Sequence, residues 1–302
     1  MAYLMEVSFD SSHRLRKKRY LFSYGGTDFK LVQDNPRRHA DHLLSVLPTD
    51  DDASRQRVFA IASEFLSALS WETGGRVAVW PAGGRGWRDD AQLADAEPCM
   101  YTFPRIPFGG NTIGYDLWRV PHISTNEQRR ALALLREARA ANSVYLAFLF
   151  YWQVMEVSGG HADAIINRAW RRHRNQVRLD PADVDRLALA GRSLGDYLRE
   201  DCRHAIAHVT RRPGRRALDL DRLEERTRFE ISTRVAGAFA EHFIREHLNL
   251  GDLWLARPRS GGVPAFVDRN ALRTGRFVQI WPARPRIPGG VRPRRATVGR
   301  AR

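Results

Sequence analysis

The sequence predicts an α+β protein of 302 residues, with a mixed α/β domain at residues 1–121, a helical bundle at 122–250 and a basic tail at 251–302. Three observations support this order. Short β-type runs separated by glycine turns concentrate near the N-terminus. Helical periodicity with short connections begins after residue 121, as in a bundle. Arginine, proline and glycine dominate the end of the chain.

The N-terminal domain is expected to combine a small sheet with one helix. Residues 20–24 and 29–32 flank Gly25-Gly26, which is a hairpin signal. The other expected elements are a strand at 3–9, a helix at 53–69, a short strand at 76–80 closed by Pro81, and loops with short edge strands over 83–121.

The bundle is expected to contain five or six helices. Ser124, with Glu127 three residues later, has the form of a helix N-cap. The expected helices span about 124–140, 143–156, 161–173, 180–190, 193–209 and 220–248.

The tail carries an excess of positive charge. Twelve of its residues are arginine, against Asp252 and Asp268, and the whole chain has a formal net charge of +15. Such a tail attracts polyanions, nucleic acid above all, although a solvated tail without a specific target is equally consistent with this composition. Residues 277–281 could add an edge strand to the sheet, and disorder is expected beyond Pro282.

Cysteine usage and hydropathy narrow the class of protein. Cys99 and Cys202 are too few for a disulfide framework and lack metal-ligand spacing. The sequence shows no signal peptide and no apolar run near 18 residues, so we expect a soluble, cytoplasmic protein without a membrane partner.

The helix at 193–209 concentrates the candidate chemistry. Ser193 with Asp196 predicts its start, and an apolar stripe at spacings of three and four faces a core. Four charged or titratable side chains share this short span: Asp201, Arg203, His204 and His208. Arg203 and His208 form an Arg-x4-His spacing, which is weak as a bare pattern because Arg199/His204 repeats it.

The run 203–208, RHAIAH, resembles the active branch of the HEPN superfamily of small helical bundles, which carries Arg-x4-6-His. Residues 200–203, 205–208 and 65–71 resemble the MauJ-like family associated with methylamine-utilisation gene clusters. The HEPN resemblance covers roughly 122–250. The name of the second family records a gene neighbourhood and establishes no reaction.

The HEPN resemblance implies metal-independent endoribonuclease activity with no cofactor. His208 would be the general base or acid, Arg203 the phosphate clamp and His204 an auxiliary group. The substrate-binding residues would be Arg199, Arg211, Arg212, Arg215 and Arg216. Five residues at about 100° each place Arg203 and His208 about 140° apart on an ideal helix, so a homodimer is expected to complete the site.

Two alternatives remain open at the level of sequence. Asp201, His204 and His208 share one helical face and could bind a metal, with Glu156 as a candidate further group. In a non-catalytic accessory or RNA-binding protein of a methylamine-utilisation or defence operon, Arg203 would instead pair with Glu200. Outside this helix, His39 and His42 could form a second polar site with Arg37, Arg38 and Asp41, although the solvated start of a helix is the favoured interpretation.

Overall fold

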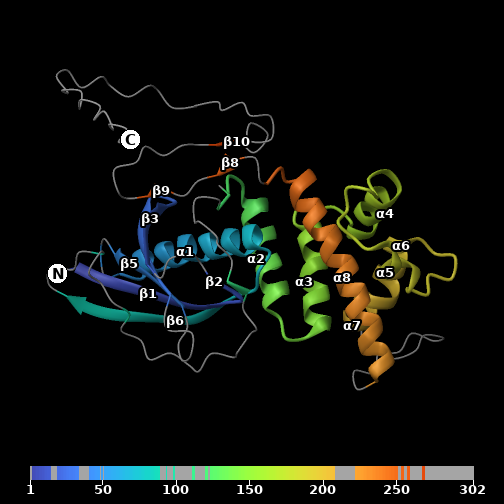
Figure 1. Cartoon of the computed structure of the whole chain (residues 1–302), viewed down its shortest axis with the longest axis horizontal. Helices are drawn as coiled ribbons and strands as arrows, with labels where there is room; N and C mark the ends of the chain where they lie inside the picture. Colours follow the sequence, from blue (N-terminus) through green and yellow to red (C-terminus); the bar gives the residue numbers. More distant parts are fainter. Residues whose placement is uncertain are drawn as a thin grey trace, which may run out of the picture.

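The computed structural model contains an N-terminal antiparallel sheet with one long helix, followed by a group of helices (Figure 1). The α+β fold class predicted from the sequence is therefore confirmed. The structure describes residues 2–14, 19–33, 41–47, 49, 51–88, 93, 98, 111–112, 120–121, 123–207, 222–250, 253–254, 257–258 and 267–268.

The main sheet is antiparallel, with the strand order β6-β1-β5-β4-β3-β9. Its strands are β1 (Ala2–Ser11), β3 (Arg19–Tyr24), β4 (Thr27–Val32), β5 (Asp41–Leu47), β6 (Val77–Arg88) and β9 (Arg257–Pro258). Two small pairs accompany it: β2 (His13–Arg14) with β7 (Asn111–Thr112), and β8 (Leu253–Trp254) with β10 (Val267–Asp268). The expected strand at 277–281 lies outside the described residues.

The hairpin predicted around Gly25-Gly26 is confirmed by the pairing of β3 with β4. Both glycines have positive φ, at 56° and 77°. A two-residue turn of this kind needs positive φ at both positions, which glycine adopts without strain. The strand expected at 76–80 was predicted too short. Strand β6 continues through Pro81 because it lies at the edge of the sheet, where the missing N–H of proline interrupts no second ladder.

Helix α1 (Asp52–Thr73) packs against the sheet through aromatic contacts. The Phe65 ring lies 4.6 Å from that of Phe22 and 5.5 Å from that of Tyr24. Asp51 caps the start of the helix by accepting from the N–H of Ser54, and Gly74 ends it in the left-handed conformation. The helix therefore extends a few residues beyond the 53–69 expected from periodicity.

The prediction that His42 marks a solvated helix start is wrong. His42 lies in the central strand β5 and is only 1% exposed, with its Nδ1 2.6 Å from Oε1 of the similarly buried Glu6 on β1. Ser8 is its cross-strand neighbour. The charged residues at 37–42 hid the strand in the sequence. A histidine is usually exposed, and its burial beside a carboxylate partner cannot be recognised from its neighbours in the chain.

The helical region begins after residue 123. Its helices are α2 (Asn126–Ala140), α3 (Val144–Glu156), α4 (Ala162–Arg172), α5 (Pro181–Asp185), α6 (Leu194–Tyr197), the π-helical segment η2 (Leu198–Arg203), α7 (His204–Ala207) and α8 (Leu223–Glu246). The N-cap of α2 is Thr125, one residue later than predicted. Thr125 forms a capping box with Gln128.

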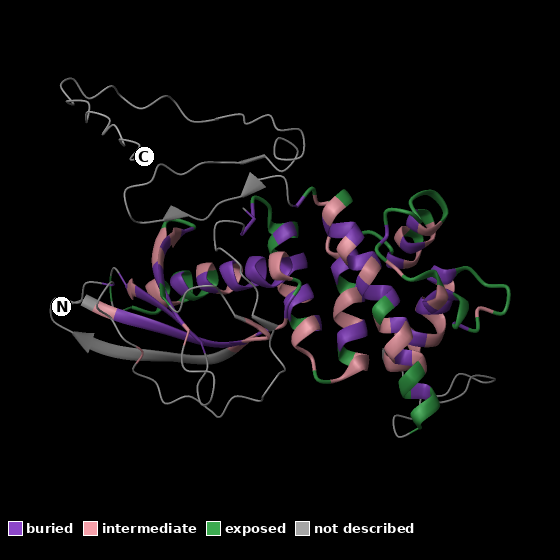
Figure 2. Cartoon of the chain, viewed as in Figure 1, coloured by how far each residue is buried: buried purple, intermediate pink, exposed green. Residues whose placement is uncertain are grey.

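One cluster of buried apolar side chains runs from the sheet and α1 into the helical region, and Figure 2 shows buried residues along the facing sides of α1, α2, α3 and α8. Two arginines of α2 also bridge to carbonyls of α1: Arg136 Nη1 donates to Ser63 at 3.0 Å, and Arg139 Nη1 donates to Ser70. The division into separate domains at residue 121 stays a prediction. No helix in the described part of the chain is long and apolar enough to cross a membrane.

Candidate functional site

The helix predicted at 193–209 is described up to residue 207 and contains a π-helical segment in its middle. Helix α6 leads into η2 and then α7 without a break. The N–H of His204 donates to the carbonyl of Arg199, five residues earlier, in place of the α-helical partner four residues earlier. Single π-turns inside α-helices are rare and are frequent at functional sites.

The start of this helix is fixed against α4. Ser193 Oγ accepts from the N–H of Asp196, as an N-cap does, and donates to its carboxylate at 2.6 Å. Asn167 on α4 accepts from the N–H of Gly195 at 2.8 Å and donates to Ser193 Oγ at 2.9 Å. A Cβ on Gly195 would lie 2.3 Å from the carbonyl oxygen of Asp163, so only glycine permits this close approach.

The π-helical segment is held from the other side by α8. Arg228 Nη1 donates to the carbonyl oxygen of Asp201 at 3.2 Å, while its Nη2 donates to Glu225 at 2.7 Å. A π-turn disturbs the regular pairing of helix carbonyls, and this guanidinium supplies a donor there. Cys202, which faces the core, donates to Ser232 at 3.4 Å, and burial raises its pKa to about 11. This thiol is therefore not a nucleophile at neutral pH.

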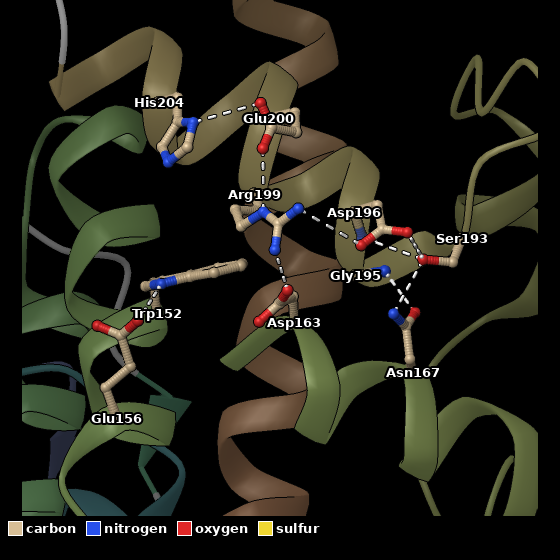
Figure 3. A network of polar contacts seen from close by, with 10 residues as sticks. All are labelled: Trp152, Glu156, Asp163, Asn167, Ser193, Gly195, Asp196, Arg199, Glu200 and His204. Carbon is tan, nitrogen blue, oxygen red and sulfur yellow. Dashed lines mark hydrogen bonds and ion pairs between the residues drawn. The ribbon is translucent and has the colours of Figure 1, made fainter. Parts of the chain in front are cut away.

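Arg199, Glu200 and His204 converge in one polar network (Figure 3). Arg199 Nε donates to Glu200 Oε1 at 3.0 Å, and its Nη1 donates to Asp163 of α4. Asp196 lies further from it, at 3.8 Å. Nδ1 of His204 lies 3.3 Å from the other carboxylate oxygen of Glu200. Glu200 thus contacts both Arg199, its neighbour in sequence, and His204, four residues later.

Arg203 differs from the other arginines of this helix region. It ends the π-helical segment and is half-buried. Among the described residues no hydrogen-bond or ion-pair partner faces it, whereas Arg199 is held by carboxylates. The pairing of Arg203 with Glu200, expected for a non-catalytic protein, is absent between these two described side chains because Glu200 contacts Arg199 and His204 instead.

The remaining predicted site residues fall beyond the described part of the helix. His208, the proposed base or acid, and the substrate-binding arginines Arg211, Arg212, Arg215 and Arg216 lie outside the described residues. Their roles stay predictions. Arg199, also predicted to bind substrate, already contacts three carboxylates, which leaves its guanidinium little capacity for a phosphate.

The proposed metal ligands are distributed over separate contacts. Asp201 pairs with Arg192 at 2.5 Å, and His204 lies beside Glu200. Glu156 accepts from the indole N–H of Trp152 at 2.8 Å. Within the described ranges no group of three His, Cys, Asp or Glu side chains could hold a metal ion. His208 is outside those ranges, so its part in a metal site is untested.

The sequence contained no sign of several groups that shape this site. The apolar residues of 193–209 recur at spacings of three and four, as in an ordinary amphipathic helix, so they gave no indication of the π-turn. Asp163, Asn167 and Arg228 come from helices distant in sequence, and no local pattern connects them to 193–207.

Comparison with family profiles gives a match to part of the chain. The profile of the family described as "Methylamine utilization protein MauJ" matches residues 131–245, which extend from within α2 to the end of α8 and include the π-helical segment. The chain is thus similar to this family over most of its helical region. No curated protein and no solved structure matches the chain.

Proposed function

We propose that this MauJ-like protein is an endoribonuclease that cleaves RNA through Arg203 and His208 without a metal ion. One observation carries the proposal: Arg203 is half-buried at the end of a π-helical segment and faces no carboxylate among the described residues. A guanidinium in that position keeps its five donors for an anion, and a phosphodiester presents oxygens that match its forked geometry.

The reaction follows from the chemistry of these two groups. His208 would accept the proton of a ribose 2′-OH. The 2′-oxygen would form a bond to the adjacent phosphorus while the bond from phosphorus to the 5′-oxygen breaks, and the 5′-oxygen leaves with a proton. The products are a 2′,3′-cyclic phosphate and a 5′-hydroxyl. Arg203 would stabilise the charge that develops on the phosphate oxygens.

A homodimer is part of this proposal. The π-helical segment ends at Arg203, so it does not reduce the angle of about 140° that a regular helix would place between Arg203 and His208. A twofold axis between two copies of the helical region would bring Arg203 of one copy toward His208 of the other. His204 would assist, held by Glu200, and the arginines at 211–216 would attract the RNA backbone.

The test is cleavage of a labelled single-stranded RNA by protein free of contaminating nuclease. Arg203→Ala and His208→Ala should each lower the cleavage rate about 100-fold or more, the range measured for loss of a transition-state donor or a general base. Arg130→Ala is the matched control, because Arg130 is an exposed arginine on α2 without an ion pair among the described residues. It should cleave within about twofold of the parent. An inactive parent protein, or a His208→Ala variant as active as the parent, would refute the proposal.

A non-catalytic accessory role in methylamine utilisation is the second candidate, and the similarity to the MauJ family favours it. In a host that grows on methylamine, loss of the gene should then abolish growth on this substrate. The Arg203→Ala variant should restore growth as well as the parent does. Restoration by the parent alone would instead favour the catalytic proposal.

A further inference from the structure

Five arginines cluster within eleven residues at the end of α4 and in the turn after it. They are Arg168, Arg171, Arg172, Arg174 and Arg178, here named the α4 arginine cluster. All five are exposed, and Figure 2 colours the turn after α4 as exposed. The run from 167 to 179 contains no acidic residue. The cluster therefore contributes five positive charges to one end of the helical region.

These arginines lack the carboxylate partners that arginines of the neighbouring elements have. In the described part of the chain, none of the five forms an ion pair. Between α5 and the end of α8 the opposite holds for seven arginines that each contact a carboxylate: Arg186, Arg192, Arg199, Arg226, Arg228, Arg234 and Arg245. A genome-wide preference for arginine would not produce this difference between adjacent segments.

The stability of α4 explains only part of the cluster. Arg171 and Arg172 occupy the last turn, where the helix dipole favours positive charge. Arg168 lies earlier in the helix, three and four residues from them, a spacing at which like charges repel by a few tenths of a kcal/mol. Arg174 and Arg178 come after the helix. The repulsion is tolerated without any compensating carboxylate among the described residues, which is the pattern of a surface that meets an anion.

Nearby histidines sense the positive potential of the cluster. Burial lowers the pKa of His247 at the end of α8, and the charge of Arg168 lowers it further. The His173 ring lies 6.0 Å from that of His242, whose pKa is lowered by burial and also by His173. Of the cluster, Arg168 thus acts on His247, where Glu246 opposes it.

One arginine of the cluster is held in place by an aromatic ring. The Arg174 guanidinium carbon lies 4.4 Å from the centre of the Trp170 ring, which itself contacts Phe239 of the core. Stacking restricts the movement of the guanidinium, whose N–H groups can still donate to an anion. The same helix carries Asp163 and Asn167, which contact the helix of the candidate site. Arg168, Arg171 and Arg172 of the cluster thus lie on the helix that contacts the candidate site.

We propose that the α4 arginine cluster binds the phosphate backbone of single-stranded RNA. The ligand class rests on the proposed ribonuclease function. Arginines that lack carboxylate partners, one of them stacked on an indole, suit a flexible polyanion whose phosphates are held by forked guanidinium groups.

The experiment measures binding separately from cleavage. A fluorescent 2′-O-methyl oligoribonucleotide of about 20 residues binds as RNA but lacks the attacking hydroxyl, so its affinity does not depend on catalysis. The variant Arg168→Gln/Arg172→Gln is compared with Arg57→Gln/Arg130→Gln. The control removes two exposed helical arginines that also lack ion pairs among the described residues, but from α1 and α2. Thermal unfolding confirms that both variants are folded.

Loss of two phosphate contacts should reduce the slope of log K against log salt concentration by about 1.4, since each contact to a single strand contributes about 0.7. If the variant and the parent bind equally at 1 M salt, this difference in slope makes the variant bind roughly 25-fold more weakly than the parent at 0.1 M salt. The control variant should bind like the parent.

Equal losses in both variants, or a parent that does not bind the oligonucleotide, would overturn the proposal. Binding of phosphatidylglycerol vesicles with the same dependence on α4, but not of RNA, would overturn it in favour of a membrane surface. Binding with no cleavage of ordinary RNA would support the cluster and refute only the ribonuclease.

Discussion

Replacing Gly195 by alanine should destabilise the fold by forcing α6 away from α4. The added Cβ would lie 2.3 Å from the carbonyl oxygen of Asp163 and 2.9 Å from the side chain of Asn167. An ordinary contact needs about 3.4 Å, so one helix must move by about 1 Å. The obstacle is backbone, which cannot rotate aside as a flexible side chain can.

The expected magnitude combines three contributions. Overpacking of this kind costs about 1–3 kcal/mol. Loss of the hydrogen bond from the Gly195 N–H to Asn167, now 2.8 Å long, costs about 1 kcal/mol. The higher helix propensity of alanine offsets about 1 kcal/mol. The free energy of unfolding of Gly195→Ala should therefore be about 1–3 kcal/mol below that of the parent.

Urea denaturation followed by far-UV circular dichroism measures this difference. Gly160→Ala is the control, because its Cβ would meet only the flexible end of Ile165 at 3.3 Å. This control should lie within about 0.5 kcal/mol of the parent. If Gly195→Ala proves as stable as the parent, α6 does not approach α4 as closely as described, and the anchoring of the site helix through Asn167 is wrong.

Three further predictions concern the same helix. An equal mixture of Arg203→Ala and His208→Ala protomers should regain about a quarter of the parental cleavage rate. Half of the dimers are then mixed, and each mixed dimer holds one intact site of two. No recovery of cleavage would place both groups of a site in one protomer. The Cys202 thiol has a pKa of about 11 in the fold against 9.0 as its ordinary value, so its contribution to stability is complete below pH 9 and is lost as the pH rises through 11. The unfolding free energy, measured by urea titration across this pH range, should fall by about 3 kcal/mol more in the parent than in Cys202→Ala. An equal pH dependence of the two proteins would contradict burial of the thiol. Arg228→Met should lower the unfolding free energy by about 1–3 kcal/mol, because Arg228 donates to the carbonyl of Asp201. The control Arg226→Met removes a more exposed arginine and should lower it by less than about 0.5 kcal/mol. Similar losses in both variants would show that Arg228 does not support the π-turn.

The order of elements could be predicted from the sequence because local signals dominate there. The Gly25-Gly26 turn, the apolar periodicity of α3 and α8 and the cap at Ser193 each depend on neighbours within a few residues. The length of β6 could not be predicted from the sequence. Pro81 is tolerated there because β6 lies at the edge of the sheet, and that position depends on how the strands are arranged. His42 was misassigned for a similar reason: its partner Glu6 lies on another strand.

The candidate site was predictable in part. The concentration of charge on one helix, including Arg203 and His204, is visible in the sequence. The π-turn is not, because it results from competition between contacts on two sides of the helix. Gly195 and Ser193 fix its start against α4, while Arg228 holds the carbonyl of Asp201 from α8. Such a balance depends on distances between helices, which no spacing rule encodes.

The π-turn at 198–203 gives this helix a simple route to a different surface. The π-turn contains one residue more than a turn of α-helix. This extra residue changes the direction in which Arg203 and the residues after it face, relative to Gly195 at the start of the helix. Removing one residue there would restore an ordinary α-helix and rotate everything downstream by about 100° with Ser193 and Gly195 undisturbed. Arg203 would then point in a new direction on an unchanged scaffold. A single-codon deletion is therefore enough to re-aim this polar face.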